Sequence, residues 1–540
     1  MRVAFFAACL AAFIPAGLAQ TTLVAERGQL LPLGDRILQP LKYSVGGTGD
    51  WAACVRTDNS HSARQVVLMV NGQVVFRSAD ILAATGQTLG NRFDDIQIND
   101  AGSVAFIGGV RGTGPDFLAA VFVDGEIVLQ DGDLIGTRFI RRIDRMDYGS
   151  DGRLSAIVTL DSYDFGAPTV LVDLDLSQSN PVPTLRIDAG FVYADGATVQ
   201  SVLGVWNRGS GSGLVYAVEE TATGVVRTVA RTRADVVVAT GDPSPFGGAP
   251  WNFSPFLGEQ ARFDISEGGA VAALGRINSI SSADRAIAVD GQAIVRVGDT
   301  VPINGTSVVR QLDTTVFGMT KNDRPMYSVL ISATAQSSDR DRVVFVGDTP
   351  VLMDGMAVLG TTVQSLIEFT SINIRPISDN GAFFLHLANL ADGRSGLLLG
   401  ELGLGTESCG PAVPNSTGQS AHLIATGSGL AGGAPLRLVA TSLPVQQFGI
   451  FFVGDSTNSV TPPGSDGVLC IGGQLGRFNG SIASSGAIGQ LEFQVDTTAI
   501  PLNPPTAIQA GETWLFQAWF RDANPTATSN FTDAVAVTFH

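Results

Sequence analysis

The residue types that carry nucleophilic and zinc chemistry are scarce in this 540-residue chain. Acyl transfer needs a nucleophile, a base and an orienting acid within hydrogen-bond reach of one another. No G-x-S-x-G motif occurs, and neither H-E-x-x-H nor a paired C-x-x-C is present. We interpret the four histidines as surface or hydrogen-bonded core residues: His61, His386, His422 and His540. The sequence therefore predicts no catalytic residue and no zinc site.

Carboxylates are the abundant reactive groups, with 50 aspartates and glutamates. Glycoside hydrolysis needs only two carboxylates at a suitable separation, so these numbers keep that chemistry open. Calcium also accepts carboxylate and carbonyl oxygens from loops. The densest calcium candidates are Asp147, Asp151, Asp522 and Asn524. Turns need the same residue types, so a purely structural role is the competing interpretation.

The five tryptophans have two competing interpretations. They are Trp51, Trp206, Trp251, Trp514 and Trp519. Exposed together, they would form a platform on which sugars stack. On alternating strands, however, large aromatic side chains most often pack in a core, which is the interpretation we favour.

The cysteines indicate one disulfide and one inert thiol. Cys409 and Cys470 lie 61 residues apart in the last quarter of the chain. An oxidising compartment would join them, so we expect a disulfide there. Cys54 follows Trp51-Ala52-Ala53 on an apolar strand, where a buried thiol is expected. Cys9 lies in the segment that we expect to be removed on export.

An internal repeat supplies the elements that would position a site. Its clearest copy is Ile98–Phe106, where Asn-Asp-Ala-Gly precedes an apolar run. An Asn side chain can bond the backbone of such a turn, and glycine accepts a positive φ. Related segments occupy 46–53, 149–156, 266–273, 320–327 and 378–385, with a degraded copy at 206–215. Each copy predicts a turn followed by a buried strand.

A second pattern follows most of these turns after 20 to 30 residues: a strand, a hairpin, another strand and often Gly-Asp. The dipeptides that favour type I′ hairpin turns are Asn71-Gly72, Asp124-Gly125, Asp290-Gly291 and Asp354-Gly355. The unit-ending dipeptides are Gly132-Asp133, Gly241-Asp242 and Gly298-Asp299. One repeat therefore contains four short strands.

The spacing of the turns predicts a β-propeller. Gly49 and Gly102 are 53 residues apart, and Gly102 and Gly152 are 50 apart. Residues 22–404 then divide into seven units of about 55 residues, each a four-stranded blade. Six or eight blades are the alternatives. The last unit lacks its final hairpin, and the strand-like segment 23–31 would complete it and remove an open sheet edge.

These repeats resemble the bacterial tandem-repeat proteins named for an N-x-x-G-x-x-A-F motif. Asn99, Gly102, Ala105 and Phe106 match that motif fully, and the other copies match it in part. The resemblance covers residues 40–400. It implies a secreted, propeller-like repeat domain, and the family brings no established activity with it.

The composition changes after Gly403, and residues 406–540 read as an antiparallel β-sandwich. Short alternating runs are separated there by Gly, Pro and Ser, and Trp514–Phe520 is apolar on both faces, as a central strand would be. Cys409-Gly410, 415–418, 473–478 and 514–533 resemble a C-terminal module that many exported proteins of some bacteria share. That module has no assigned biochemistry, and its recurrence suggests surface retention or targeting.

The N-terminus and the overall charge indicate where the chain works. Arg2, an apolar run over 3–14 and small residues at Gly17 and Ala19 predict a signal peptide over 1–19. No later stretch has the ~18 apolar residues of a membrane span. The net charge of −17 argues against nucleic acid, whose phosphates need Lys and Arg. We expect a secreted or cell-surface protein.

These observations favour a non-catalytic binding or scaffold protein of unknown ligand. Its expected parts are a propeller over 22–404 and a retention or targeting module over 406–540. A polysaccharide or a cell-surface protein is the expected partner, and no cofactor besides calcium is suggested. One alternative is an extracellular carbohydrate-active enzyme with carboxylates at the mouth of the propeller. Another is a purely structural propeller that forms part of a cell-surface layer.

Overall fold

The computed structural model describes the chain from residue 18 to residue 539, with gaps. Outside the described residues lie 1–17, 33, 100, 112–116, 150, 162–166, 179–180, 209–211, 233–234, 248, 254–260, 267–268, 278–283, 302, 304–306, 320–323, 333–340, 348, 360, 368–374, 379–381, 428, 430, 432–435, 487–488, 524–525 and 540. Most of the predicted signal peptide therefore falls outside them. The chain forms two compact units, Thr21–Leu399 and Gly400–His540. No helix in the described part is long and apolar enough to cross a membrane.

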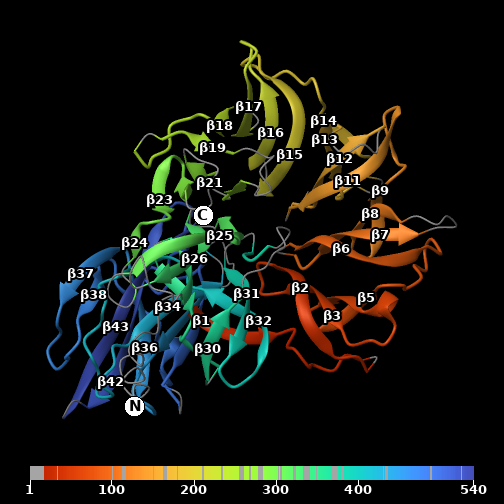
Figure 1. The fold of residues 1–540 in the computed structure, drawn as a ribbon. Coiled ribbons are helices and arrows are strands. Elements are labelled where there is room, and N and C mark those ends of the chain that lie inside the picture. Colours follow the sequence, from red (N-terminus) through yellow and green to blue (C-terminus); the bar gives the residue numbers. More distant parts are fainter. Residues whose placement is uncertain are drawn as a thin grey trace. The chain divides into compact units, whose positions relative to one another are not determined.

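The first unit is a β-propeller of antiparallel sheets arranged around a centre (Figure 1). Blade 1 contains β2 (Ile37–Val45), β3 (Trp51–Thr57), β4 (Val66–Val70) and β5 (Gln73–Arg77). Blade 2 contains β6 (Thr88–Ile98), β7 (Val104–Arg111), β8 (Leu118–Val123) and β9 (Glu126–Gln130). Blade 3 contains β10 (Leu134–Ile135), β11 (Arg138–Tyr148), β12 (Arg153–Leu160), β13 (Thr169–Asp175) and β14 (Thr184–Ile187).

The remaining blades follow the same plan. Blade 4 contains β15 (Thr198–Arg208), β16 (Ser212–Glu220), β17 (Val226–Arg231) and β18 (Val236–Ala239). Blade 5 contains β19 (Trp251–Asn252), β20 (Arg262–Ile265), β21 (Val271–Ile277), β22 (Arg285–Val289) and β23 (Gln292–Arg296). Blade 6 contains β24 (Thr300–Val301), β25 (Ser307–Met319), β26 (Pro325–Ser332), β27 (Asp341–Val346) and β28 (Thr349–Met353). Blade 7 contains β29 (Ala357–Val358), β30 (Thr361–Leu366), β31 (Phe383–Leu390) and β32 (Ser395–Leu402), with β1 (Leu18–Val24) beside β32.

Seven blades in the described residues confirm the predicted all-β propeller and the favoured blade number. The strand beside β32 is N-terminal, as predicted; it begins at Leu18 and overlaps the predicted segment 23–31 at Leu23 and Val24. Its continuation is also tied to blade 7, because Arg27 N–H donates to the Ser395 carbonyl at 2.7 Å. This N-terminal strand covers the edge that β32 would otherwise expose.

The repeat motif forms the turn between the first two long strands of a blade. In blade 2 the Asn99 side-chain oxygen accepts from the backbone N–H of Ala101 at 3.1 Å and of Ser103 at 2.9 Å. Gly102 has a φ of +79°, which an L side chain rarely adopts. The turn glycines of blades 1, 3 and 5 also have positive φ. In blade 2 the motif has a conformational role, because its Asn99 side chain closes the turn between β6 and β7.

The hairpins between the outer strands are of the predicted type in blades 1, 2 and 5. Both residues of Asp124-Gly125 have positive φ, +48° and +92°, as a type I′ turn requires. The Asp124 carboxylate also accepts from Val104 N–H at 2.8 Å and so joins the hairpin to β7. Asn71 binds Trp51 N–H, and Asp290 binds Val271 N–H, at the same distance of 2.8 Å.

The prediction for Asp354-Gly355 was wrong. This dipeptide follows β28 and ends its unit, as Gly132-Asp133 does. Gly355 N–H donates to the Val363 carbonyl at 2.8 Å, and Gly132 N–H donates to the Ile140 carbonyl at 2.7 Å. A glycine at positive φ suits both kinds of turn, so the dipeptide alone did not distinguish them.

Apolar cores fill the space between neighbouring blades. One contains Ala105 and Ile107 of blade 2 together with Ile143 and Ala156 of blade 3, all buried. Comparable cores join blade 1 to blade 2, blade 3 to blade 4, blade 4 to blade 5, blade 5 to blade 6, and blade 7 to blade 1. Blades 1 to 5 are therefore stabilised by the burial of both of their faces.

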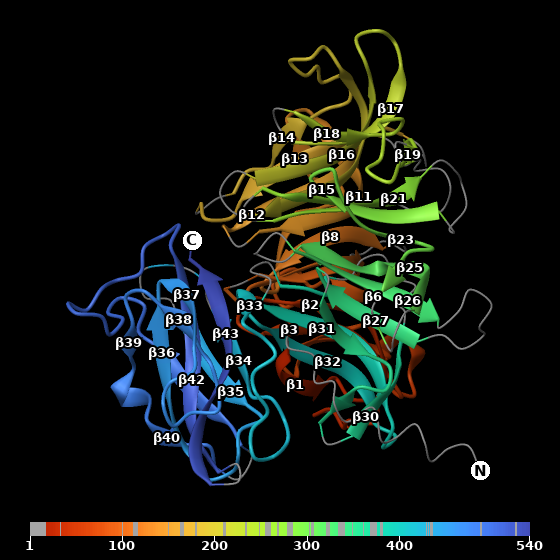
Figure 2. The ribbon, with the colours of Figure 1, turned by 90° about the vertical axis from the view of Figure 1, so that its left-hand side faces the viewer.

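The second unit is a β-sandwich, as predicted. One sheet contains β33 (Thr406–Ser408), β43 (Ala527–Thr538), β42 (Thr513–Ala523), β36 (Phe448–Gly454), β39 (Gly476–Arg477) and β40 (Ala483–Ser484). The facing sheet contains β34 (His422–Gly427), β35 (Leu436–Thr441) and β41 (Leu491–Val495), and β37 (Ser456–Val460) pairs with β38 (Leu469–Gly472). Figure 2 shows β36, β42 and β43 side by side.

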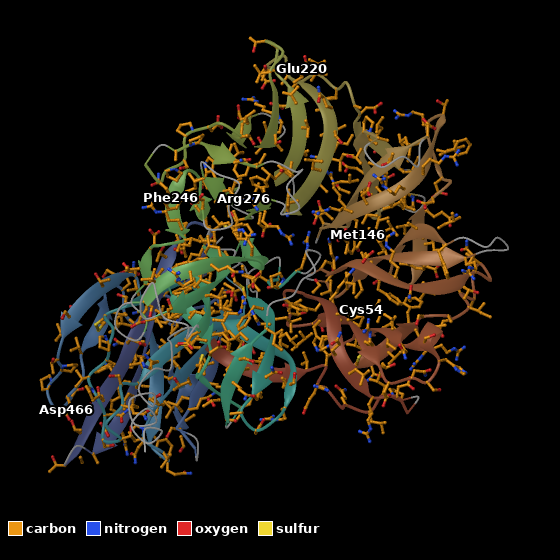
Figure 3. The ribbon with its side chains drawn as sticks, viewed as in Figure 1. Cys54, Met146, Glu220, Phe246, Arg276 and Asp466 are labelled. Atoms are coloured by element: carbon orange, nitrogen blue, oxygen red, sulfur yellow. A yellow bond between two sulfur atoms is a disulfide. The ribbon has the colours of Figure 1, made fainter. Side chains whose placement is uncertain are left out.

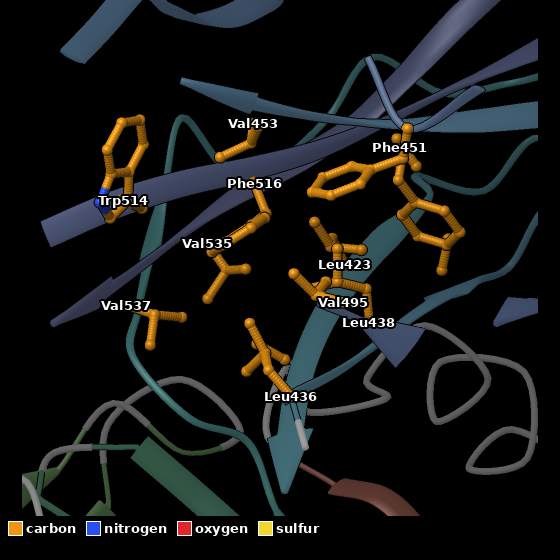
Figure 4. Packing of buried hydrophobic residues seen from close by; sticks show 14 of the residues in the cluster. Leu423, Leu436, Leu438, Phe451, Val453, Val495, Trp514, Phe516, Val535 and Val537 are labelled. Carbon is orange, nitrogen blue, oxygen red and sulfur yellow. The ribbon is translucent and has the colours of Figure 1, made fainter. Parts of the chain in front are cut away.

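Strand β42 is central and covered on both faces, as its apolar sequence indicated. Phe516 faces the core of the sandwich, where Phe451, Leu438 and Val535 surround it (Figure 4). Leu515, on the other face, packs in a second cluster with residues of β38. Successive side chains of β42 point to opposite faces of the sheet, so the strand packs in two cores.

Candidate functional site

The inner strands of the propeller line a cavity at its centre, which we call the central cavity. Blades 2 to 7 all contribute to its wall, and the volume is about 90 Å³. This is room for several waters or a small molecule. The lining residues are Asp95, Ile96, Gln97, Arg145, Met146, Asp147, Val205, Trp206, Arg262, Phe263, Asp264, Phe317, Arg375, Pro376 and Ile377. Figure 3 labels Met146, which lies at the end of its blade that faces the centre.

A repeated hydrogen bond joins the inner strands of adjacent blades at this cavity. The position two residues before the turn motif carries a polar side chain in several blades, and that side chain accepts from the next blade's backbone. Ser44 accepts from Ile98 N–H at 3.1 Å, Gln97 from Tyr148 N–H at 2.6 Å, and Asp264 from Met319 N–H at 2.7 Å. The Gln97 amide also donates to the Met146 carbonyl at 2.9 Å.

The three carboxylates of the central cavity each have a partner. Asp95 accepts from Met146 N–H at 3.1 Å. Asp147 forms an ion pair with Arg375, which reaches it from blade 7. Asp264 accepts from Ile265 N–H at 3.0 Å as well as from Met319 N–H. These groups therefore hold blades together.

Burial gives Asp95 an unusual protonation equilibrium. Desolvation raises the pKa of its carboxyl, and the charge of Arg145 and the Met146 N–H oppose that rise. A buried carboxyl with a raised pKa can hold a proton closer to neutral pH than an exposed aspartate can. Asp95 thus has a property that acid catalysis uses.

Arg262 has the opposite character. Its Nε and Nη2 atoms are shielded from solvent and have no hydrogen-bond partner among the described residues. Burial, assisted by the charge of Arg145, lowers the pKa of the Arg262 guanidinium to about 9. Because this value is above 7, the group is positively charged at neutral pH. Arg262 therefore brings an unsatisfied cation to the central cavity.

The structure separates the two calcium candidates of blade 3. Asp147 is buried and paired with Arg375 in the central cavity. Asp151 lies in the turn after β11, where its carboxylate accepts from Arg153 N–H at 3.0 Å. The two carboxylates have different partners, and both stabilise local structure.

The candidate in the second unit is also engaged. Asp522 is buried, and its carboxylate accepts from Ser416 N–H at 3.1 Å and from Ala523 N–H at 2.8 Å. Asn524 lies outside the described residues. Within the described part of the chain, no group of three or more His, Cys, Asp or Glu side chains could hold a metal ion.

The cysteines are placed as the sequence predicted. Cys409 and Cys470 form a disulfide, with their Cα atoms 6.1 Å apart. Cys54 is a free, buried thiol on β3. Burial raises the pKa of the Cys54 thiol to about 12, so at neutral pH it is protonated and a poor nucleophile.

The tryptophans form no common platform. Trp51, Trp251 and Trp514 are buried in three different cores. Trp206 and Trp519 are half-buried. Trp206 lines the central cavity and meets the Phe263 ring edge-on, with 5.9 Å between the ring centroids. The interpretation of these residues as core packing therefore holds for most of them.

Sequence reasoning missed Arg262 and the inter-blade positions. A usable signal was present, because Gln97, Asp147 and Asp264 occupy the same position relative to their turn motifs. Polar residues at one register of a repeat indicate convergence on the axis of a propeller. The sequence carries no signal that the Arg262 side chain is unpaired, because this depends on which side chains of other blades lie near it.

No protein-family model and no curated protein matches this chain. Among solved structures, an α-L-arabinanase of Penicillium chrysogenum in complex with arabinobiose is 10% identical over 72% of this chain and 94% of its own, with a TM-score of 0.24. A gluconolactonase of Xanthomonas campestris is 11% identical over 72% and 98%, with a TM-score of 0.25. A GH43_12 protein from a capybara gut metagenome is 10% identical over 97% and 96%, with a TM-score of 0.23. Similarity at this level says nothing about substrate or activity.

Proposed function

We propose that this protein is an exported, non-catalytic binding protein whose propeller holds its ligand at the central cavity. The sandwich unit would retain or target the protein at the cell surface. The proposed partner is a polysaccharide, with a cell-surface protein as the second candidate. Export rests on the signal-like sequence of residues 1–19 and on the resemblance to exported repeat proteins.

The state of the cavity side chains is the observation that carries this proposal. Glycoside hydrolysis would need two carboxylates that can reach a sugar. Here Asp147 and Asp264 are already engaged, one by Arg375 and the other by two backbone N–H groups. The group with open hydrogen-bonding capacity is the Arg262 guanidinium, which binds and orients but does not exchange protons at neutral pH.

One observation favours the alternative, an extracellular carbohydrate-active enzyme. The raised pKa of Asp95 is a property of general acids in glycosidases. That enzyme would need a second carboxylate released from its present partner, since Asp147 and Asp264 are held. The two functions differ in one measurable product, which is new reducing ends.

The test combines polysaccharide depletion with a reducing-end assay. The full chain is incubated with insoluble and gelled polysaccharides, and protein and sugar are measured in the supernatant. Depletion without sugar release is the expected result. Release of sugar that Asp95→Asn abolishes would overturn the non-catalytic proposal. If the protein is not depleted and no sugar is released, a polysaccharide partner is ruled out and a cell-surface protein is favoured.

A matched pair of variants assigns the contact to the central cavity. Arg262→Gln changes the cavity, whereas Arg27→Gln changes an exposed arginine outside its lining. We expect the first substitution to weaken depletion and the second to leave it unchanged. Equal depletion by both variants would place the polysaccharide contact elsewhere on the protein.

A further inference from the structure

We propose that the central cavity binds a small oxyanion, a carboxylate or phosphate group, on the Nε and Nη2 edge of Arg262. This inference rests on the proposed binding function and adds the chemical class of the ligand. It starts from a side chain that the fold leaves unsatisfied, in a cavity large enough for a small molecule.

The two unpartnered atoms are the pair that a planar oxyanion needs. In a guanidinium group, the N–H bonds of Nε and Nη2 lie on one edge and point in nearly the same direction. This edge matches the two oxygens of a carboxylate or phosphate and forms two parallel hydrogen bonds. Both atoms are buried in this protein and neither has a partner in the described part of the chain.

The surrounding carboxylates do not take this role. Asp95 and Asp264 accept backbone N–H groups of the next blade, and Asp147 pairs with Arg375. Turning any of them toward Arg262 would break an existing inter-blade contact. A buried donor without a hydrogen-bond partner destabilises the protein. A ligand that accepts from this donor removes that cost, and the free energy recovered favours binding.

The rest of the cavity wall strengthens such a contact. Trp206, Phe263 and Phe317 line it with aromatic surface, and Ile377 adds an aliphatic side chain. Burial away from bulk water lowers the local dielectric, and a charge-assisted hydrogen bond is stronger there than in water.

Calorimetry of the full chain with defined probes tests this site. The probes are acetate, D-galacturonate and inorganic phosphate, with D-galactose as the uncharged counterpart of the uronate. We expect galacturonate or phosphate to bind and galactose to bind far more weakly. The stronger of the two anions identifies whether the natural group is a carboxylate or a phosphate, and either result supports the site.

The variants separate the charge of Arg262 from its geometry. Arg262→Gln removes both, so affinity for the bound anion should fall at least tenfold, the effect of one lost charge-assisted hydrogen bond (~1.4 kcal/mol or more). Arg262→Lys keeps the charge without the paired donors, and its loss should be intermediate. Arg27→Gln should bind like the wild type, because Arg27 is exposed and outside the cavity.

Thermal unfolding keeps the result interpretable if a variant folds poorly. Saturating anion should raise the melting temperature of the wild type and of Arg27→Gln, but not that of Arg262→Gln. Binding that is unchanged in a folded Arg262→Gln variant would overturn the proposal, as would no binding of any anion to the wild type.

The two proposals can fail separately. If the wild type and Arg262→Gln deplete a polysaccharide equally well and no anion binds through Arg262, polysaccharide binding stands with its contact elsewhere on the protein, and the anion site falls. If the anions bind through Arg262 but no polysaccharide depletes the protein, the anion site stands and the polysaccharide partner falls.

Discussion

Burial decides the chemical state of His386. This residue lies on β31 and is fully buried, with its Nδ1 atom 2.9 Å from the Leu387 carbonyl oxygen. A carbonyl oxygen only accepts, so Nδ1 carries the proton and donates it. Desolvation lowers the pKa of His386 to about 4, against a weaker effect of that hydrogen bond. His386 is therefore neutral at physiological pH, and its buried position makes it a structural residue.

This pKa makes the stability of the propeller dependent on pH. The unfolded chain takes up a proton at His386 below pH 6.5, whereas the folded protein does so only near pH 4. The contribution of His386 is therefore complete above 6.5 and is lost as the pH falls toward 4. Relative to His386→Leu, we expect the wild type to lose about 2 kcal/mol of unfolding free energy between pH 7 and pH 4.5.

Urea unfolding at both pH values measures this difference. His61→Leu is the control, because it replaces a histidine that is exposed. Parallel pH profiles of wild type and His386→Leu would show that the buried imidazole is protonated in the folded protein.

At the scale of the element, one backbone position is occupied differently in blade 1. Gly132, Gly241, Gly298 and Gly355 end their units at positive φ and donate to the carbonyl of the following inner strand. Ala79 makes the same contact, donating to the Leu89 carbonyl at 2.7 Å, but with a φ of +66°. A left-handed conformation costs a non-glycine residue about 1 kcal/mol.

Ala79→Gly should therefore stabilise the protein. Relief of the left-handed strain outweighs the added flexibility of glycine in the unfolded chain, and we expect a gain of about 0.5–1 kcal/mol. Denaturant unfolding measures the gain. Gly132→Ala makes the reverse change at φ +98°, where a Cβ would meet no atom within 4 Å, so it should destabilise through strain alone. A loss of stability in Ala79→Gly would mean that the Cβ packing of Ala79 outweighs its strain.

The contact between blades offers a second element-scale prediction. The Gln97 amide makes two hydrogen bonds to β11, one to Tyr148 N–H and one to the Met146 carbonyl, and both are buried. Gln97→Ala leaves both backbone groups without these bonds, and we expect a loss of about 2–3 kcal/mol. Gln73→Ala, on the exposed face of β5, should cost less than about 0.5 kcal/mol. Equal effects of the two substitutions would show that Gln97 does not join the blades.

Local signals explain which elements the sequence could predict. Turns and hairpins such as Asn99–Gly102 and Asp124-Gly125 depend on residues within a few positions, so their sequences predicted their conformations. Asp354-Gly355 failed because two different turns accept the same dipeptide. The partners of the cavity residues could not be predicted in this way, since Gln97 and Tyr148 are 51 positions apart and meet only after both blades form.

At the scale of the whole molecule, the chain consists of two units with separate cores. The propeller has cores between its blades, and the sandwich has its own core around Phe516 and Phe451. The repeat period predicted the first unit, and the loss of that period after Gly403 indicated the second. The proposed ligand class could not be predicted from the fold, because it depends on which side chain the assembled blades leave without a hydrogen-bond partner among the described residues, here Arg262.

The disulfide should stabilise one unit and leave the other unaffected. Cys409 and Cys470 both belong to the sandwich unit and close a segment with a sequence separation of 61. Constraining a loop of this length in the unfolded chain stabilises the folded state by about 4 kcal/mol. In calorimetry, the double variant Cys409→Ala/Cys470→Ala should lower the sandwich transition and leave the propeller transition in place. Cys54→Ala, in the propeller, identifies the other transition. If the double variant lowers both transitions together, the units unfold as one, because a stabilisation confined to the sandwich reaches the propeller only through coupled unfolding.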